Sequence, residues 1–375
     1  MKMEFSVFRQ VLVNALGHMQ SIIEKRNTLP ILSNVKIEAG VDLTLTATNV
    51  DLELIEHVAA DVSAPGSITI PVQSFYDFVR KLPEAAQIKV NLSESGDFVV
   101  ESGRSVFRFQ TMPADNFPTM VAPSATTKFA MNTDDLARLV NQVKFAIPTD
   151  DVRYHLGGIY FHIDDSKRIA AVATDSQRLA FCSLPAPAGS ESMPAVILPR
   201  RLVAEVANLL GDVKVDDVTI ELSDTKARFV IGSATLTSKL VDAQYPNYRI
   251  VIPKNNEKVA TMNTKEFVNA IDLVSAAGND KTKPVQLGFS MNRLVASVSS
   301  STDGNSVAGT EELDIEYNSD DKFQISFNLR FLLDIAGQIG SDKMQLVMQD
   351  PLSPTLIRSA SSDSDSLFVL MPMRI

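Results

Sequence analysis

The sequence predicts an α+β protein built from three tandem repeats of one domain. The chain has 375 residues, which is more than one hydrophobic core usually organises. Helical patterns recur along it with a period of about 125 residues, long enough for each copy to be a domain. Between the helices, apolar and polar residues alternate with the period of two that is typical of strands. Antiparallel sheets with two helices on one face would satisfy this pattern.

The first helix of each repeat starts with a shared motif. The motif reads Met131-Asn132-Thr133-Asp134-Asp135-Leu136 in the second copy and Met262-Asn263-Thr264-Lys265-Glu266-Phe267 in the third. Asn or Thr is a suitable N-cap, and acidic residues favour the first turn. A weaker match that begins at Phe5 supplies the first copy. These patterns predict helices over 9–26, 134–145 and 265–275.

The second helix of each repeat follows on the same schedule. The residue pairs that introduce it are Ile70-Pro71, Leu198-Pro199 and Phe327-Asn328. Apolar residues at helical spacing then predict helices over 74–82, 200–210 and 329–339. Each copy carries an acid at the same place, namely Asp77, Glu205 and Asp334. Because they belong to separate repeats, we expect them to be solvated or to contact other elements, and not to form a carboxylate cluster.

Strands and linkers complete the repeats. Alternating segments run over 41–48, 169–174 and 294–300, and Pro-containing linkers at 123–126 and 253–256 separate the copies. The predicted domains are therefore 1–127, 128–256 and 257–375. Three such domains in tandem form an arc, and an arc with matching ends can close by symmetric dimerisation.

The composition limits the classes of function. There are 35 Lys and Arg against 45 Asp and Glu, a net charge of −10, which argues against gripping nucleic acid by bulk electrostatics. The six helical segments nevertheless sum to +3 and the remainder to −13, which fits helices that face phosphates loosely. One cysteine and four histidines predict no internal disulfide, no metal and no cofactor. We also expect a cytoplasmic protein, since no apolar run approaches the ~20 residues that span a bilayer and no secretory segment is present.

A search for catalytic motifs finds none. The sequence contains no G-x-S-x-G elbow, P-loop or G-x-G-x-x-G. His155 and His162 point to opposite faces of a strand pattern, so we expect solvent-facing polar side chains and not a shared metal. Cys182 lies in a strand and is expected to be a small core residue. The sequence thus favours a non-catalytic protein.

Six motifs in order resemble one known family, the bacterial replicative sliding clamp, which is the β subunit of DNA polymerase III. The motifs are Arg26-Asn-Thr-Leu-Pro-Ile-Leu32, Asp151-Val-Arg-Tyr-His-Leu156, Ala173-Thr-Asp-Ser-Gln-Arg-Leu179, Thr237-Ser-Lys-Leu-Val-Asp242, Tyr245-Pro-Asn-Tyr248 and Met371-Pro-Met-Arg-Ile375. The resemblance covers essentially the whole chain. It implies a homodimeric ring of DNA-clamp domains that encircles duplex DNA without sequence preference and has no catalytic centre. Such a ring tethers the polymerase catalytic subunit, and it also binds the clamp loader and other proteins with a clamp-binding motif.

The resemblance also implies three sets of site residues. The DNA contacts would be Arg26, Gln73, Tyr154, His155 and Arg201. The dimer interface would include Arg104, Ala276 and Ala277. The partner-peptide cleft would consist of Leu156, Thr174, Ser176, Gln177, Arg178, Leu179, Pro246, Val251, Asn328, Phe331, Leu352, Val369, Leu370, Met371, Pro372, Met373 and Arg374. Leu and Met side chains repack for varied ligands, while polar groups orient the peptide.

The sequence departs from the family pattern at several of these positions. Ser176-Gln177 replaces Gly-His, Ile250 stands where an Arg is common, and Thr282 stands where an aromatic residue can cap the cleft. At DNA-contact positions, Gln73 and Asp150 carry no positive charge.

Two other functions remain open at this point. One is a peptide-binding scaffold without DNA function, which the net charge of −10 would suit. The other is a hydrolase or transferase with a site between repeats, which would need a convergent nucleophile and base.

Overall fold

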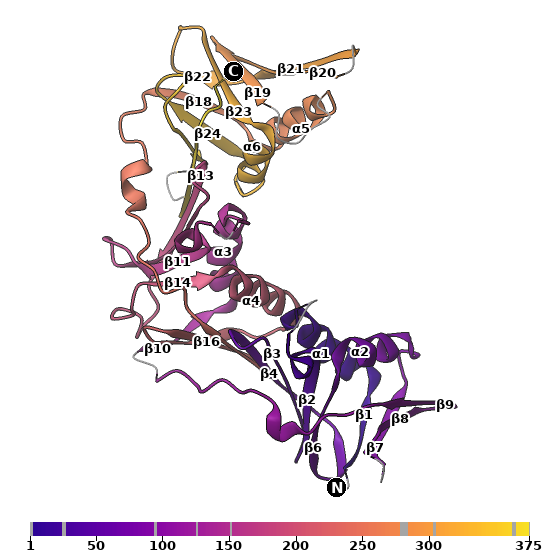
Figure 1. Cartoon of the computed structure of the whole chain (residues 1–375). Helices are drawn as coiled ribbons and strands as arrows, with labels where there is room; N and C mark the ends of the chain where they lie inside the picture. The colour runs from indigo at the N-terminus through magenta and orange to yellow at the C-terminus, as the bar shows by residue number, and fades with distance from the viewer. Residues whose placement is uncertain are drawn as a thin grey trace. The chain divides into compact units, whose positions relative to one another are not determined.

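A computed structural model gives the fold and describes residues 3–24, 28–93, 96–124, 127–150, 152–277, 284–302, 305–361 and 365–374. The chain forms two compact units (Figure 1). The first unit comprises Met1–Ala137 and Pro187–Val241, and the second comprises Arg138–Ala186 and Asp242–Ile375. Each unit combines strands from two successive predicted repeats.

The predicted helices are all present. They are α1 (Arg9–Ile22), α2 (Val72–Lys81), α3 (Thr133–Val143), α4 (Arg200–Asp212), α5 (Thr264–Ser275) and α6 (Leu329–Ala336). Asn side chains cap two of them as expected: the Oδ1 of Asn263 accepts from the Glu266 N–H at 3.0 Å, and that of Asn328 accepts from the Phe331 N–H at 3.1 Å. Short 3₁₀ turns are η1 (Pro30–Ser33), η2 (Ala114–Asn116), η3 (Lys144–Ala146), η4 (Tyr154–Leu156) and η5 (Tyr248–Val251).

Two antiparallel sheets form the first unit. The smaller has the order β5 (Asp61–Ala64), β1 (Glu4–Phe8), β7 (Gln87–Leu92), β8 (Phe98–Ser102) and β9 (Ser105–Phe109). The larger has the order β10 (Thr127–Asn132), β15 (Asp217–Leu222), β16 (Lys226–Ile231), β17 (Ala234–Lys239), β4 (Leu52–Val58), β3 (Leu43–Thr48), β2 (Asn34–Ala39) and β6 (Gly66–Pro71). Strand β14 (Val196–Pro199) leads into α4. The larger sheet joins two repeats where β17 pairs with β4, with Leu236 opposite Leu54.

Antiparallel strands also build the second unit. One sheet runs in the order β11 (Gly158–Ile163), β12 (Arg168–Thr174), β13 (Arg178–Pro185), β26 (Ser366–Leu370), β25 (Thr355–Ser359), β24 (Lys343–Met348), β18 (Lys258–Asn263) and β22 (Glu316–Tyr317). The other has the order β21 (Asn305–Asp314), β20 (Arg293–Thr302), β19 (Pro284–Ser290) and β23 (Phe323–Asn328). The second and third repeats meet where β13 pairs with β26, with Leu179 opposite Val369.

The core lies between helices and sheets and is rich in phenylalanine. Phe75 of α2 is fully buried and meets Phe98 of β8 edge to face, with ring centroids 5.6 Å apart. Cys182 is fully buried in β13, where desolvation raises the pKa of its thiol, so the prediction of a core cysteine is confirmed. Among the described residues, no helix has the length and apolar character needed to cross a membrane.

The expectation of a solvent-facing His162 is wrong. Its side chain is only 3% exposed, its ring stacks on Tyr160 at 4.3 Å, and its Nε2 lies 3.1 Å from the Tyr248 hydroxyl oxygen. The segment that carries Tyr245 and Tyr248 packs against this face of β11, with the ring of Tyr245 4.8 Å from that of Tyr160. A strand pattern does not show such a cover, because the covering residues are more than 80 positions away.

Burial of His162 predicts loss of stability in acid. Desolvation lowers the pKa of its imidazole from 6.5 to about 4. Between these two pH values the unfolded chain therefore binds more protons than the folded chain. The free energy of unfolding is highest above pH 6.5 and falls by at most about 3 kcal/mol as the pH falls toward 4. Urea unfolding at pH 7 and pH 4.5 checks this. The His162→Phe variant should lose less stability over that range than the wild type, and an equal loss would contradict the assignment.

Candidate functional site

The turn between β12 and β13 is the centre of the candidate site. Thr174 Oγ1 donates to the Arg178 carbonyl oxygen at 2.7 Å. The Oδ1 of Asp175 accepts from the backbone N–H groups of Gln177 and Arg178 at 3.0 and 2.9 Å. Ser176 takes a φ of +75°, the left-handed region that favours glycine. These bonds fix the backbone of the turn that leads into Arg178.

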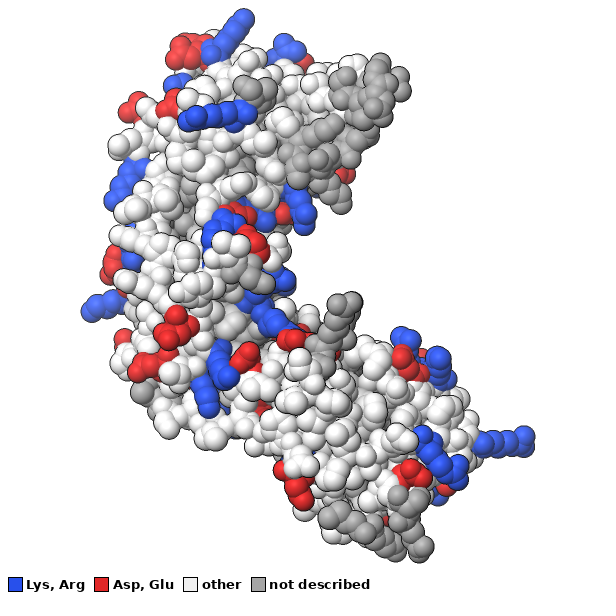
Figure 2. Space-filling view, viewed as in Figure 1, with Lys and Arg blue, Asp and Glu red and all other residues white. Residues whose placement is uncertain are grey.

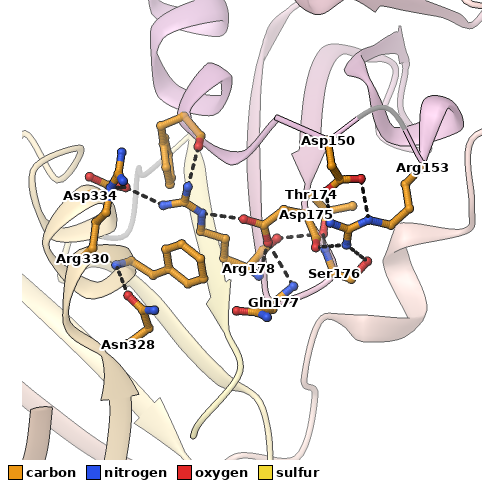
Figure 3. Close-up of polar contacts among 12 residues, drawn as sticks. Asp150, Arg153, Thr174, Asp175, Ser176, Gln177, Arg178, Asn328, Arg330 and Asp334 are labelled. Carbon is orange, nitrogen blue, oxygen red and sulfur yellow. Dashed lines mark hydrogen bonds and ion pairs between the residues drawn. The ribbon is translucent and has the colours of Figure 1, made fainter. Parts of the chain in front are cut away.

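Arg178 is the most connected side chain of this turn, and Figure 3 shows its contacts. Its Nε donates to Asp175 Oδ2 at 3.0 Å, its Nη1 to Asp334 Oδ2 at 2.6 Å and its Nη2 to the Phe145 carbonyl oxygen at 2.7 Å. The guanidinium also lies over the ring of Phe331, 4.1 Å from the centroid, and 5.0 Å from that of Phe145. Only 9% of the side chain is exposed. Charge-assisted hydrogen bonds and stacking together hold it rigidly.

A second arginine supports the turn from outside. Arg153 Nη1 donates to the Asp175 carbonyl oxygen at 2.5 Å and to Ser176 Oγ at 3.1 Å, while its Nη2 pairs with Asp150 at 2.5 Å (Figure 3). The hydrogen bond from Arg153 lowers the pKa of the Asp150 carboxyl group. Sequence reasoning gave Arg153 no role. Its place in the motif that ends at Leu156 was the available signal, but the turn residue that its side chain contacts, Asp175, lies 22 positions on.

The left-handed backbone at Ser176 predicts a sharp dependence on residue type. A β-branched residue at this φ is strained, so Ser176→Val should destabilise the protein by about 1–3 kcal/mol. Ser176→Gly relieves the strain but raises the entropy of the unfolded chain, and should change stability by less than about 1 kcal/mol. Thermal unfolding of both variants tests this. Equal midpoints for Val and Gly would rule out a strained position.

The chain end runs beside this turn. The Met371 N–H donates to the Gln177 carbonyl oxygen at 2.8 Å, and the Met373 N–H donates to the Ser326 carbonyl oxygen at 2.7 Å. The segment after β26 is thus held at one end by the turn and at the other by β23. Next to it is a cavity of about 500 Å³ lined by Gln286, Gln324, Ile325, Ser326, Pro351, Leu352, Met373 and Arg374. The cavity has both apolar and amide side chains, which suits an extended peptide.

The residues predicted for the peptide cleft all lie in the second unit, in two environments. Four are nearly inaccessible: Leu156, Leu179, Val369 and Leu370. The more accessible ones include Val251 at 47%, Leu352 at 58% and Met371 at 41% exposed. Asn328 uses its side-chain oxygen to cap α6. The buried set can therefore only support a binding surface, which the exposed set would form. Thr282 lies outside the described residues, and Ile250 is 79% exposed.

The predicted DNA-contact residues occupy helices and a 3₁₀ turn. Tyr154 in η4 is 62% exposed, and His155 beside it meets its ring edge to face at 5.9 Å. Gln73 in α2 accepts from Gln20 at 2.6 Å and donates to Asp77 at 3.0 Å. Arg201 in α4 binds Glu24 and the Ile22 carbonyl oxygen. Arg26 lies outside the described residues.

Two of the three acidic residues at equivalent helix positions contact other elements, as expected. Asp334 accepts from Arg178, and Glu205 accepts from Ser21 Oγ at 2.5 Å. Asp77 pairs with Arg80 of its own helix at 2.8 Å. Within the described part of the chain, no three His, Cys, Asp or Glu side chains are arranged to hold a metal ion.

Comparison with known families covers nearly the whole chain. Three models match in order: the DNA polymerase III beta subunit N-terminal domain over residues 3–121, its central domain over 130–247 and its C-terminal domain over 249–374. The beta sliding clamp of Caulobacter vibrioides is 39% identical over 380 residues, with all of both chains covered. That of Escherichia coli K12 is 33% identical over 379 residues, again with full coverage.

Solved structures agree with the sequence matches. A crystal structure of the Caulobacter crescentus beta sliding clamp aligns with a TM-score of 0.94 at 37% identity, covering 100% of this chain and 99% of the other. The sliding clamp of Bartonella birtlesii, bound to griselimycin, aligns with a TM-score of 0.94 at 39% identity and full coverage of both chains. The chain therefore belongs to the family of beta sliding clamps, the non-catalytic processivity subunits of DNA polymerase III.

Proposed function

We propose that two copies of this chain close into a ring around duplex DNA and tether the replicative polymerase to it. The match of three clamp-domain models in sequence order carries this proposal. The proposed domains are 1–127, 128–256 and 257–375. The proposed ring works in the cytoplasm without a cofactor, and a clamp loader places it on DNA. The family match does not favour a hydrolase or a scaffold without DNA function.

The ring would be closed by two sheet edges. Strand β9 is at the end of the first unit's smaller sheet, and β21 is at the end of the second unit's smaller sheet. Val106 and Phe107 of β9 are about half exposed, and so is Val307 of β21. Arg104 is exposed beside β9 and Ala276 is exposed at the end of α5, whereas Ala277 is buried against Gly309 of β21. Unpaired strand edges with apolar side chains are suited to pairing between protomers.

The DNA-facing residues would be Gln73, Tyr154, His155 and Arg201, together with Arg26. Their side chains offer amide, hydroxyl, imidazole and guanidinium donors to phosphate oxygens. They provide little positive charge, so binding should be independent of sequence and should fade with salt.

The partner-peptide site would be the exposed surface around Arg178 and the chain end. Met371 and Leu352 supply adaptable apolar contacts, and Gln177 supplies an exposed amide. Leu179 and Leu370 beneath them keep this surface in place. An isolated peptide that buries two apolar side chains here should bind with micromolar affinity.

Retention on circular DNA tests the proposal. The protein is loaded on nicked circular DNA with a clamp loader, separated from free protein and then treated with a nuclease that linearises the circle. A ring that encircles DNA stays on the circle and is released by linearisation. Equal retention on circular and linear DNA, or a monomeric mass by light scattering at micromolar concentration, would overturn it.

A further inference from the structure

One of the proposed DNA-contact residues is already bound to a carboxylate of its own unit. Arg201 Nη1 donates to Glu24 Oε1, and Arg201 Nη2 donates to the Ile22 carbonyl oxygen at 2.9 Å. Glu24 is held in turn by Asn49, whose Nδ2 donates to the same Oε1 at 3.2 Å. The guanidinium therefore has an anionic partner within its own unit.

The position of this ion pair makes exchange with an external anion feasible. Arg201 is 42% exposed and Glu24 is 50% exposed, so water and dissolved ions reach both groups. An exposed ion pair contributes little to folding stability, and breaking it costs correspondingly little. Arg201 also lies in the first turn of α4, which has no acidic residue and where a cation opposes the helix dipole. The arginine is thus not placed to stabilise its own helix.

Carboxylate and phosphate compete for the same donors of a guanidinium. Both accept charge-assisted hydrogen bonds from its N–H groups, so a carboxylate bound to the guanidinium competes with a phosphate for those donors and offsets part of its positive charge. Pairing of opposite charges recurs on the described surface, in Arg80 with Asp77 and Arg153 with Asp150. Figure 2 shows Lys and Arg side chains beside Asp and Glu side chains at several places on the face in view.

We propose that Glu24 occupies the place of a DNA phosphate on Arg201 and thereby weakens the hold of the chain on duplex DNA. This inference rests on the proposed function, since it requires DNA to pass Arg201. A phosphate must compete with the Glu24 carboxylate for the guanidinium and meets an arginine whose charge is already partly offset, so the contact adds little net affinity at any one position. The ring can then move along the duplex without losing a strong bond at each step.

Three variants separate this effect from a simple change in net charge. Glu24→Gln keeps the shape of the side chain but removes its charge, and so frees Arg201 for phosphate. Glu205→Gln is the matched control: it removes one negative charge near α1 from a residue of α4 whose described hydrogen-bond partners are Ser21 and Asn208 and include no arginine. The double variant Glu24→Gln with Arg201→Ala removes the cation that the proposal requires.

The measurement is the affinity for a short duplex, by fluorescence anisotropy, between 50 and 200 mM salt. One additional phosphate contact should steepen the slope of log affinity against log salt by about 0.9, so Glu24→Gln should lose about 3.5-fold more affinity over this range than the wild type. Glu205→Gln should have the wild-type slope. The double variant should not show the steeper slope of Glu24→Gln.

The outcomes distinguish this inference from the proposed function. Equal effects of Glu24→Gln and Glu205→Gln, or a gain that survives Arg201→Ala, would overturn the role of Glu24. Each variant is also tested for retention on circular DNA. If the wild type itself is not retained there, the proposed function has failed, whatever the salt slopes show.

Discussion

Removal of residues 371–375 is expected to abolish binding of partner peptides while leaving the dimer and its retention on DNA nearly intact. Strand β26 ends at Leu370, so the truncation removes no residue of a sheet. It does remove Met371 and Met373, whose backbone N–H groups bind Gln177 and Ser326 and whose side chains would form part of the proposed peptide surface. Losing the contacts of two apolar side chains costs roughly 3–6 kcal/mol of gross binding energy, at least a 100-fold loss of affinity.

Calorimetry with a clamp-binding peptide measures this loss, and sedimentation of the same protein measures the dimer. Met373→Leu is the matched control, because it conserves volume and apolar character and should change affinity little. A truncated protein that is monomeric, or one with unchanged peptide affinity, would show that the peptide surface has been placed wrongly.

Replacement of Arg178 by alanine is expected to cost about 3 kcal/mol of the free energy of unfolding of the second unit, and to abolish peptide binding with it. The Asp175 carboxylate, whose side chain is 13% exposed, would lose the only cation that lies within salt-bridge distance of it among the described residues. Removing one member of a buried ion pair commonly costs 3–5 kcal/mol, and the lower end applies because Asp334 is 33% exposed.

Urea unfolding of the variant measures this cost. Arg330→Ala is a suitable control, since Arg330 lies 4.0 Å from the same Asp334 but is 65% exposed, and its loss should cost about 0.5 kcal/mol or less. Arg178→Lys keeps the charge but not the planar fork, and should fall between the two. If Arg178→Ala were as stable as Arg330→Ala, the contacts of Arg178 would contribute no more to the free energy of unfolding than an exposed ion pair does.

Periodic features of the sequence predicted the fold well. The helix over 200–210 is observed as Arg200–Asp212 and that over 265–275 as Thr264–Ser275, because an amphipathic stripe defines each helix locally and Asn263 also caps the second. The helix predicted over 9–26 is shorter in the structure and ends at Ile22. There the apolar spacing that supported the prediction ends, and the next residue is extended.

The candidate site was less predictable because its contacts join distant positions. The sequence motif that contains Arg178 indicated the right turn, but not that the side chain would bind Asp334, which is 156 positions away. The resemblance implies Leu179 and Leu370 as cleft residues, and only the packing shows that both side chains are buried. The sequence gives no sign of the pairing of Glu24 with Arg201, because the two residues are 177 positions apart.

The pairing of β17 with β4 has a consequence for any attempt to divide the chain. A fragment that stops after the first repeat would leave β4 with a bare row of backbone N–H and C=O groups opposite the missing segment 234–238. Leu54, fully buried in the intact sheet, would lie on a strand that has lost its neighbour. Such an edge is a template for association with other copies. Single repeats should therefore aggregate when expressed alone, and the shared sheet makes adjacent repeats depend on each other for solubility.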